Sequence, residues 1–103
     1  MAITKFKKQS FEAFPVYGNF EDALSLGETI ELASSTVTCV DVNGDDVTSD
    51  CIESSSLQVQ DSKLVAQCKN GEEALSPYLI TFRIITTDNN KYEVDLKMIV
   101  KEV

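Results

Sequence analysis

Three cysteines and a short acidic turn are the residues of this sequence whose types and spacing could support chemistry. Cysteine thiolates act as nucleophiles or metal ligands. Residues 41–46 gather carboxylate and amide oxygens of the kind that calcium binds. The chain contains no histidine. A Ser–His or Cys–His catalytic pair and a histidine-ligated metal are therefore excluded within this chain.

The cysteines are Cys39, Cys51 and Cys68, an odd number that cannot form a complete set of intrachain disulfides. No Cys-x-x-Cys pair occurs. Cys39 and Cys68 lie in runs where apolar residues alternate, and a thiol in such a run behaves as a small buried hydrophobe. We expect three reduced, structural cysteines, with one disulfide as the alternative.

The acidic turn lacks the ligand spacing of an EF-hand loop, so we interpret it as a solvated turn and expect no metal site. The 4 glycines are scattered and form no phosphate-binding loop. No Gly-x-Ser-x-Gly motif occurs, and no carboxylate lies within an apolar run. We therefore predict no catalytic residue, no cofactor and no small-molecule substrate, and hence a protein that is not an enzyme.

The formal net charge of −8 is distributed unevenly along the chain. Residues 1–12 carry +2, which leaves −10 on the remainder. Such a charge opposes binding to phosphate polymers, so we expect no nucleic-acid partner. No apolar run is long enough to cross a membrane, and the start of the chain has no apolar stretch of a secretory signal, so we expect no membrane partner and synthesis in a reducing cytoplasm.

Five of the eight aromatic residues lie within the first 20 positions, without a helical or strand period. We interpret residues 1–20 as an extended N-terminal arm and residues 21–103 as the folded domain. Exposed aromatic side chains anchor interfaces, and lysines can meet acidic surfaces. Two arrangements remain open, because the arm can pack on its own domain or insert into a neighbouring subunit. The candidate interface residues are Lys5, Phe6, Lys7, Lys8, Phe11, Phe14 and Tyr17.

The remaining chain has the pattern of short strands separated by turns. Residues 78–86 and 92–100 alternate apolar and polar side chains and are joined by a polar loop, which predicts an antiparallel hairpin. Shorter strands are expected at 28–33, 35–42, 47–53, 57–60 and 63–68, with a loop at 54–56. Residues 21–27 are compatible with one helical turn. This spacing predicts an all-β fold, an immunoglobulin-like antiparallel β-sandwich of about seven strands.

Tyr78 opens the first strand of the predicted hairpin, directly after Ser76-Pro77. In immunoglobulin-like domains a tyrosine at this place forms a corner, with its hydroxyl bonded to the backbone a few residues upstream. We predict a structural role of this kind for Tyr78, with a plain core tyrosine as the alternative.

Several fragments together resemble one family. They are residues 19–30, the Gly-Asp-Asp-Val-Thr turn at 44–48, Asn70-Gly71, Tyr78-x-Ile80-Thr81 and Thr-Thr-Asp-Asn at 86–89. Residues 14–103 resemble small phage and prophage virion proteins with an immunoglobulin-like fold, of the tail-fibre adaptor or head–tail-region type. The second glycine expected near residues 74–75 is missing.

This resemblance implies a non-enzymatic adaptor or decoration subunit located in the virion after synthesis in the host cytoplasm. Its partners would be neighbouring virion proteins and further copies of itself, bound through the arm and the sheet edges. Two alternatives come from the residues themselves. One is a calcium- or carbohydrate-binding adhesion module using the loop at 41–50. The other is an acidic inhibitor or anti-defence protein that mimics an anionic polymer.

Overall fold

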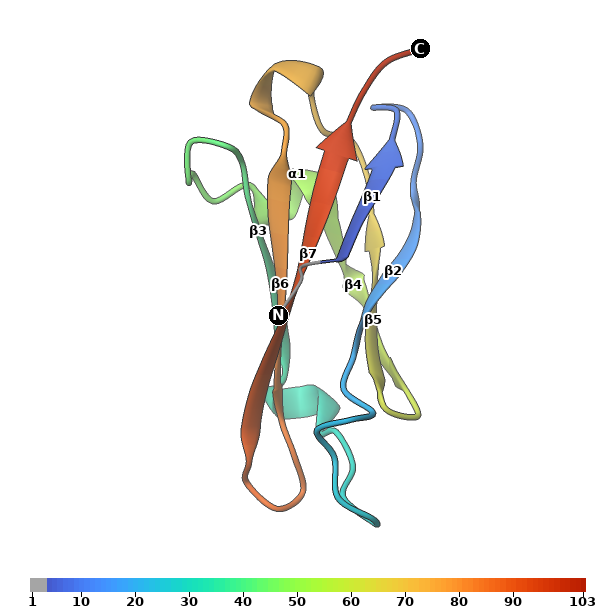
Figure 1. Ribbon diagram of the computed structural model, residues 1–103, viewed down its shortest axis with the longest axis vertical. Helices are drawn as coiled ribbons and strands as arrows, with labels where there is room; N and C mark the ends of the chain where they lie inside the picture. Colours follow the sequence, from blue (N-terminus) through green and yellow to red (C-terminus); the bar gives the residue numbers. More distant parts are fainter. Residues whose placement is uncertain (1–3) are drawn as a thin grey trace.

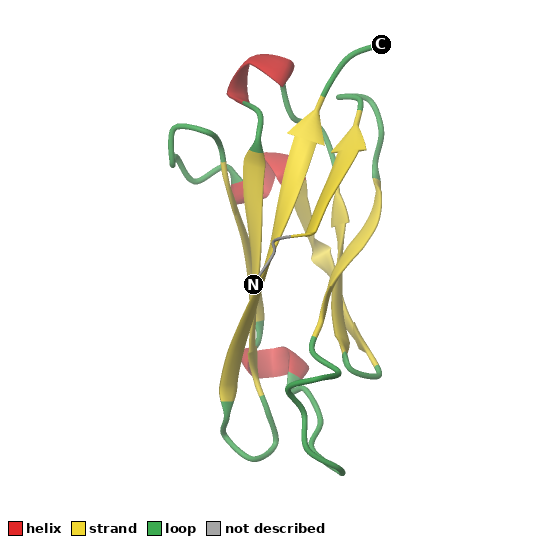
Figure 2. Ribbon diagram, in the orientation of Figure 1, coloured by secondary structure: helices red, strands yellow, loops and turns green. Residues whose placement is uncertain are grey.

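The computed structural model describes residues 4–103, which form seven strands and three short helical segments. The strands are β1 (Thr4–Lys8), β2 (Phe14–Asn19), β3 (Thr36–Val40), β4 (Ile52–Gln60), β5 (Lys63–Cys68), β6 (Tyr78–Ile85) and β7 (Lys91–Val100). The helix α1 covers Thr48–Cys51, and single 3-10 turns lie at Leu32–Ser34 and Glu73–Leu75. Figure 2 shows that the molecule is built almost entirely from strands.

The strands form two sheets packed face to face, with the orders β1-β7-β6-β3 and β2-β5-β4 (Figure 1). The orders β7-β6-β3 and β2-β5-β4 are those of the GFC and BED sheets of an immunoglobulin-like sandwich, which confirms the predicted fold class. One pairing departs from the expected antiparallel arrangement, because β1 runs parallel to β7.

The predicted terminal hairpin is present as β6 and β7, and β6 pairs over its full length, from Tyr78↔Met98 to Ile85↔Lys91. Alternation explains the pairing, since Tyr78, Ile80, Phe82 and Ile84 are buried while the residues between them are not. One face of this hairpin therefore closes on the second sheet, as the period of two requires.

The core between the sheets is centred on Phe82, whose side chain is fully buried. Gly18 of β2 lies directly against it, and a Cβ on this glycine would come within 2.9 Å of the Phe82 Cβ. The absence of a side chain at this position lets β2 approach β6. Other buried members of the core are Phe20, Ile52, Leu64, Ile80, Ile84, Met98 and Val100.

Residues 4–20 do not form a separate arm in this structure. Thr4–Lys8 pairs with β7 in one sheet, and Phe14–Asn19 pairs with β5 in the other. The expected division of the chain at residue 20 therefore has no counterpart in the strand pairing. Of the two arrangements left open above, the structure contains packing on the same chain.

Four local predictions were wrong. Residues 28–33 were expected to be a short strand, whereas they contain the single bridge Ile30↔Thr86 and the start of the 3-10 turn at Leu32–Ser34. Residues 47–53 were expected to be an edge strand and 54–56 a loop, whereas α1 occupies Thr48–Cys51 and β4 runs through all three serines. The register of β4 against β5 shifts between Glu53 and Gln58, so the serine segment bulges within the strand. Residues 21–27 form turns rather than a helical turn.

Candidate interface at the open side of the sandwich

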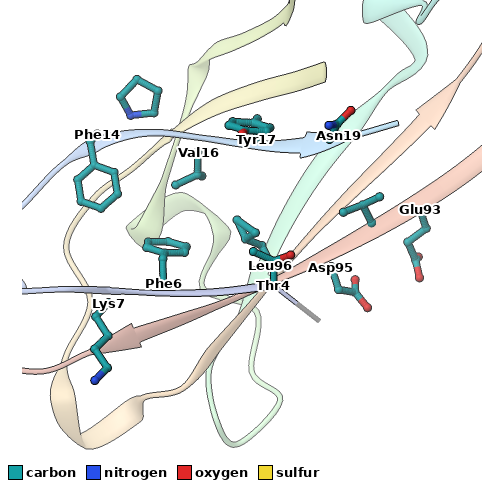
Figure 3. A pocket seen from close by; sticks show the side chains of 12 residues that line it. Thr4, Phe6, Lys7, Phe14, Val16, Tyr17, Asn19, Glu93, Asp95 and Leu96 are labelled. Carbon is teal, nitrogen blue, oxygen red and sulfur yellow. The ribbon is translucent and has the colours of Figure 1, made fainter. Parts of the chain in front are cut away.

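A groove runs between the two sheets on the side where β1 and β2 are the outermost strands (Figure 3). It has a volume of about 920 Å³. Its lining comes from β1, β2 and the first half of β7 and includes Phe6, Phe14, Val16, Val94 and Leu96. A concave, largely apolar surface of this kind is suited to receiving side chains from another molecule.

Phe6 and Phe14 face each other across the groove, one from each sheet (Figure 3). Their ring centroids are 5.8 Å apart in an edge-to-face arrangement, and both side chains remain partly exposed. Such aromatic pairs contribute about 0.5–1.5 kcal/mol beyond the area they bury. Two residues expected as interface anchors are thus brought together by strands that belong to different sheets.

The edge of β7 beside this groove is only half covered. β1 pairs with residues from Leu96 to Val100, and no described strand pairs with the same edge from Lys91 to Asp95 (Figure 1). Unpaired backbone N–H and C=O groups along such an edge form a template for an added strand. The groove therefore combines an apolar surface with a hydrogen-bonding edge.

Three outer strands, β2, β3 and β4, carry features that discourage strand addition. Pro15 in β2 has no N–H to donate. The bulge after Glu53 disrupts the regular edge of β4. The end of β3 is covered by the following loop, where Val47 N–H donates to the Cys39 carbonyl and the Cys39 N–H donates to Thr48 Oγ1. The β7 edge from Lys91 to Asp95, which adjoins the apolar groove, is therefore a candidate for pairing with another chain.

The open edge carries two outward-facing acidic residues that sequence reasoning did not select. Glu93 Oε1 forms an ion pair with Arg83 Nε at 2.6 Å. Asp95 Oδ1 accepts a 2.8 Å hydrogen bond from the Thr81 hydroxyl. Each carboxylate is bound to β6 through one oxygen. The alternation of β7 could have placed these residues on the outer face, but the strand order that makes this part of β7 an edge is not visible in the sequence.

Lys8 was expected to meet an acidic surface on a neighbour, but its side chain is buried in its own domain. It is only 3% exposed, because the alternation of β1 turns it inward together with Phe6. Its ammonium donates to the carbonyl oxygens of Gln9, Ser10 and Asn70. A buried ammonium needs such acceptors, so Lys8 ties the start of the chain to the loop after β5 and is not available at the surface.

The other predicted interface residues lie in separate places. Lys5 and Lys7 are exposed on β1. Phe11 is 96% exposed at the loop between β1 and β2, outside the groove. Tyr17 lines the groove and is half exposed, with the Lys63 ammonium 4.7 Å from its ring centroid. Phe6, Phe14 and Tyr17 therefore share one surface, while Phe11 does not belong to it.

Tyr78 has the geometry expected of a tyrosine corner. Its hydroxyl accepts a 2.8 Å hydrogen bond from the backbone N–H of Glu72, six residues upstream, and its ring is buried. Burial raises the pKa of this hydroxyl above its ordinary value. The residue fixes the loop before β6 and is not among the residues that line the groove.

All three cysteines are unpaired and buried. A hydrogen bond to the Cys51 thiol and burial raise the pKa of Cys39, and burial raises the pKa of Cys68. Within residues 4–103 no group of three acidic, cysteine or histidine side chains is arranged to hold a metal ion.

The conformation of the acidic turn is stabilised by hydrogen bonds from its backbone N–H groups to its own carboxylates. The Asp41 carboxylate accepts hydrogen bonds from the N–H groups of Asn43 and Asp45, at 2.9 and 3.1 Å. Asp46 in turn accepts hydrogen bonds from the hydroxyl and N–H of Thr48, which lower the pKa of that carboxyl. Asp41 therefore acts as a turn-forming residue here.

Comparisons with protein-family models and with curated proteins identify no relative of this chain. No protein-family model matches the chain, and no curated protein is significantly similar to it in sequence. In the described part of the chain, no helix has both the length and the apolar character needed to span a membrane.

Proposed function

We propose that this protein is a non-enzymatic structural subunit that binds a neighbouring protein by accepting an extended segment in the groove between β1 and β2. The observation that carries the proposal is the half-covered edge of β7 from Lys91 to Asp95, which lies beside an apolar groove. Main-chain pairing at a sheet edge supplies affinity, and pockets for alternate side chains supply specificity.

The chemistry of the groove describes the segment that fits it. Side chains pointing inward would meet Phe14, Val16 and Leu96, so alternate positions of the segment should be apolar. Side chains pointing outward would lie beside Glu93 and Asp95, so lysine is favoured over glutamate there. The expected partner thus contributes an extended stretch in which apolar and basic residues alternate.

The resemblance to phage virion proteins supports a more specific form of the proposal, in which the subunit is an adaptor or decoration protein of a virion. Virion assembly relies on repeated contacts between rigid domains, and a seven-stranded sandwich with a half-covered edge on β7 fits that task. Genes for portal, capsid or tail proteins beside the gene for this chain would support the virion assignment. Neighbours of an unrelated kind would count against it.

The docking part of the proposal is tested by titrating the ¹⁵N-labelled protein with a short peptide of alternating valine and lysine. Peptides of alternating valine and glutamate, and of the same valines and lysines in two blocks, are the controls. Amide shifts should gather at residues 91–95 and along the groove with the alternating lysine peptide. A variant lacking residues 1–3 is titrated in parallel, so that the start of the chain cannot compete for the edge.

Two matched variants show whether binding uses the groove. Phe14→Lys places a charge among the groove residues and should abolish peptide binding, whereas Phe11→Lys introduces the same side chain at the exposed loop and should leave it unchanged. Thermal unfolding of both variants establishes that they are folded. Equal binding by the two variants, or binding of the block peptide as strong as that of the alternating one, would contradict the proposal.

A further inference from the structure

Four lysines gather on the outer face of β1 and β7, on the side of these strands away from the core. Lys5 and Lys7 alternate with the inward-facing Phe6 and Lys8. Lys97 and Ile99 share the outer face of β7, Lys101 follows directly after the strand and lies in the same depression, and Lys5 lies directly opposite Lys97 in the parallel register. Lys5, Lys7, Lys97 and Lys101, with Ile99 between them, are called the lysine face below.

The lysine face concentrates like charge on a chain whose total charge has the opposite sign. Its four lysines carry +4, so the rest of the chain carries −12 of the total −8. Like charges directly opposite in a sheet repel each other. The two ion pairs found in the described residues, Lys69–Glu53 and Arg83–Glu93, use none of these lysines. An anionic partner would relieve this repulsion.

Acidic residues at the border of the lysine face neutralise it only in part. Glu73 lines the shallow depression formed by Lys5, Lys97 and Lys101. Its carboxylate accepts a 2.8 Å hydrogen bond from the N–H of Glu102, and the Glu102 carboxylate accepts one from Ser10. Both carboxylates therefore bind backbone groups at the end of the sandwich, and the lysines keep an excess of positive charge.

The composition of the lysine face favours an acidic protein surface over a nucleic acid. Ile99 at its centre offers an apolar contact, and the five residues of the face include no aromatic side chain or arginine on which a base could stack. A long phosphate polymer would also meet the negative charge of the remaining chain. A local cluster of carboxylates around an apolar side chain would meet only the lysines and Ile99.

The chain itself contains such a cluster in the loop between β3 and α1. Asp45, Asp46 and the nearby Asp50 are exposed there, and Val42 is 51% exposed. The loop is held in shape by the Asp41 carboxylate, which accepts the N–H groups of Asn43 and Asp45. Residues 41–50 are called the acidic loop below. They offer carboxylates and one apolar side chain, the complement of lysines around an isoleucine.

We propose that the acidic loop of one copy docks on the lysine face of a second copy. This inference rests on the proposed structural role and deepens it by naming a further copy of the chain as a partner. The contact joins two different surfaces, so it is heterologous and leads to a ring or a filament rather than to a two-fold dimer. Lys7 also lines the groove, whereas the other residues of the lysine face lie outside the groove and outside the edge from Lys91 to Asp95.

Sedimentation of the purified full chain tests the contact at about 0.01 M and about 1 M salt, where charges are screened beyond about 30 and about 3 Å. At low salt the mass should rise above the 11.4 kDa of a single chain as concentration increases, and at high salt it should return to that value. Lys5→Glu/Lys97→Glu and Asp45→Lys/Asp46→Lys should each abolish the association. An equimolar mixture of these two variants should restore it, because the reversed charges complement each other.

The control for net charge is Lys63→Glu/Lys91→Glu, which changes the total by the same amount outside the lysine face and should associate like the natural chain. Thermal unfolding establishes that each variant is folded. A single-chain mass for the natural protein at low salt, or no association in the mixture, would overturn the inference. Binding to double-stranded DNA that the Lys5→Glu/Lys97→Glu variant loses, without self-association, would also overturn it.

The two proposals fail in different ways. Phe14→Lys should abolish peptide binding in the groove and leave self-association intact. Loss of self-association alone, with peptide binding retained, would remove the second copy as a partner without affecting the groove.

Discussion

At Tyr78 a single hydroxyl joins the start of β6 to the loop before it. We expect Tyr78→Phe to lower the free energy of unfolding by about 0.5–1.5 kcal/mol, because the part-buried hydrogen bond from the N–H of Glu72 is lost. Urea unfolding followed by circular dichroism measures the change. Tyr92→Phe, which removes a hydroxyl from a half-buried ring on β7, should change it by less than about 0.5 kcal/mol. Equal effects of the two substitutions would remove the special role of Tyr78.

Glu28 joins the turn at residues 25–28 to the loop between β6 and β7, near the opposite end of the sandwich. Its carboxylate accepts hydrogen bonds from the Thr86 hydroxyl, the Ser25 N–H and the Asn90 side-chain amide. These bonds lower the pKa of Glu28 below its ordinary value. Because the pKa is lower in the folded state, the carboxylate stabilises the fold above the pKa of the unfolded chain, about 4.3. This contribution is lost as the pH falls through the folded pKa.

The pH dependence of stability provides the measurement for Glu28. Unfolding midpoints of the natural chain should fall as the pH is lowered below about 4.3, and Glu28→Gln should show a shallower fall over the same range. Glu21→Gln, at an exposed position, should retain the steep dependence. A Glu28→Gln variant with the same pH profile as the natural chain would show that this carboxylate contributes nothing to it.

At the scale of elements, the contact between β2 and β6 depends on the missing side chain of Gly18. Gly18→Ala should lower the free energy of unfolding by about 1–3 kcal/mol, because its Cβ would come within 2.9 Å of the Phe82 Cβ. A double-mutant cycle with Phe82→Leu checks the cause. The cost of Gly18→Ala should be smaller when Phe82 has been shortened. Additive costs would show that strand conformation, rather than crowding against Phe82, is responsible.

The elements that could be predicted from the sequence are those whose signal is local and regular. The hairpin of β6 and β7 alternates over most of both strands and is joined by a short polar loop, so its pairing follows from period and proximity. The segment through Ser54, Ser55 and Ser56 has no apolar alternation, because the bulge between Glu53 and Gln58 breaks the register. A run of serines suggests a loop unless the partner strand is known.

The start of the chain was the hardest part to predict for a related reason. β1 and β2 belong to different sheets, and their partners β7 and β5 lie far along the chain. Their aromatic residues therefore show no common period. The sequence could identify Phe6, Phe14 and Tyr17 as candidates for contact, but their meeting in one groove depends on this non-local pairing. The same pairing turns Lys8 inward. This could not be predicted from the sequence, because Lys8 belongs to a short basic segment whose other lysines are exposed.

At the scale of the whole molecule, the lysine face and the open edge occupy successive parts of β7. The lysine face covers the part of β7 that is paired with β1, whereas the half-covered edge begins where that pairing ends. This arrangement gives the molecule two surfaces of different chemistry, one electrostatic and one formed by backbone groups and apolar side chains. A subunit in an assembly needs at least two such surfaces to contact more than one neighbour.

Strand addition at the edge from Lys91 to Asp95 is the central claim, and amide hydrogen exchange tests this strand addition most directly. In this part of β7, amides that donate to β6 should be protected already, while those pointing to the open edge should exchange fast. Addition of the alternating valine–lysine peptide should slow the fast set, which gives protection at every second residue. Exchange at these edge amides that is unchanged by the peptide, or protection gained only elsewhere, would contradict the account.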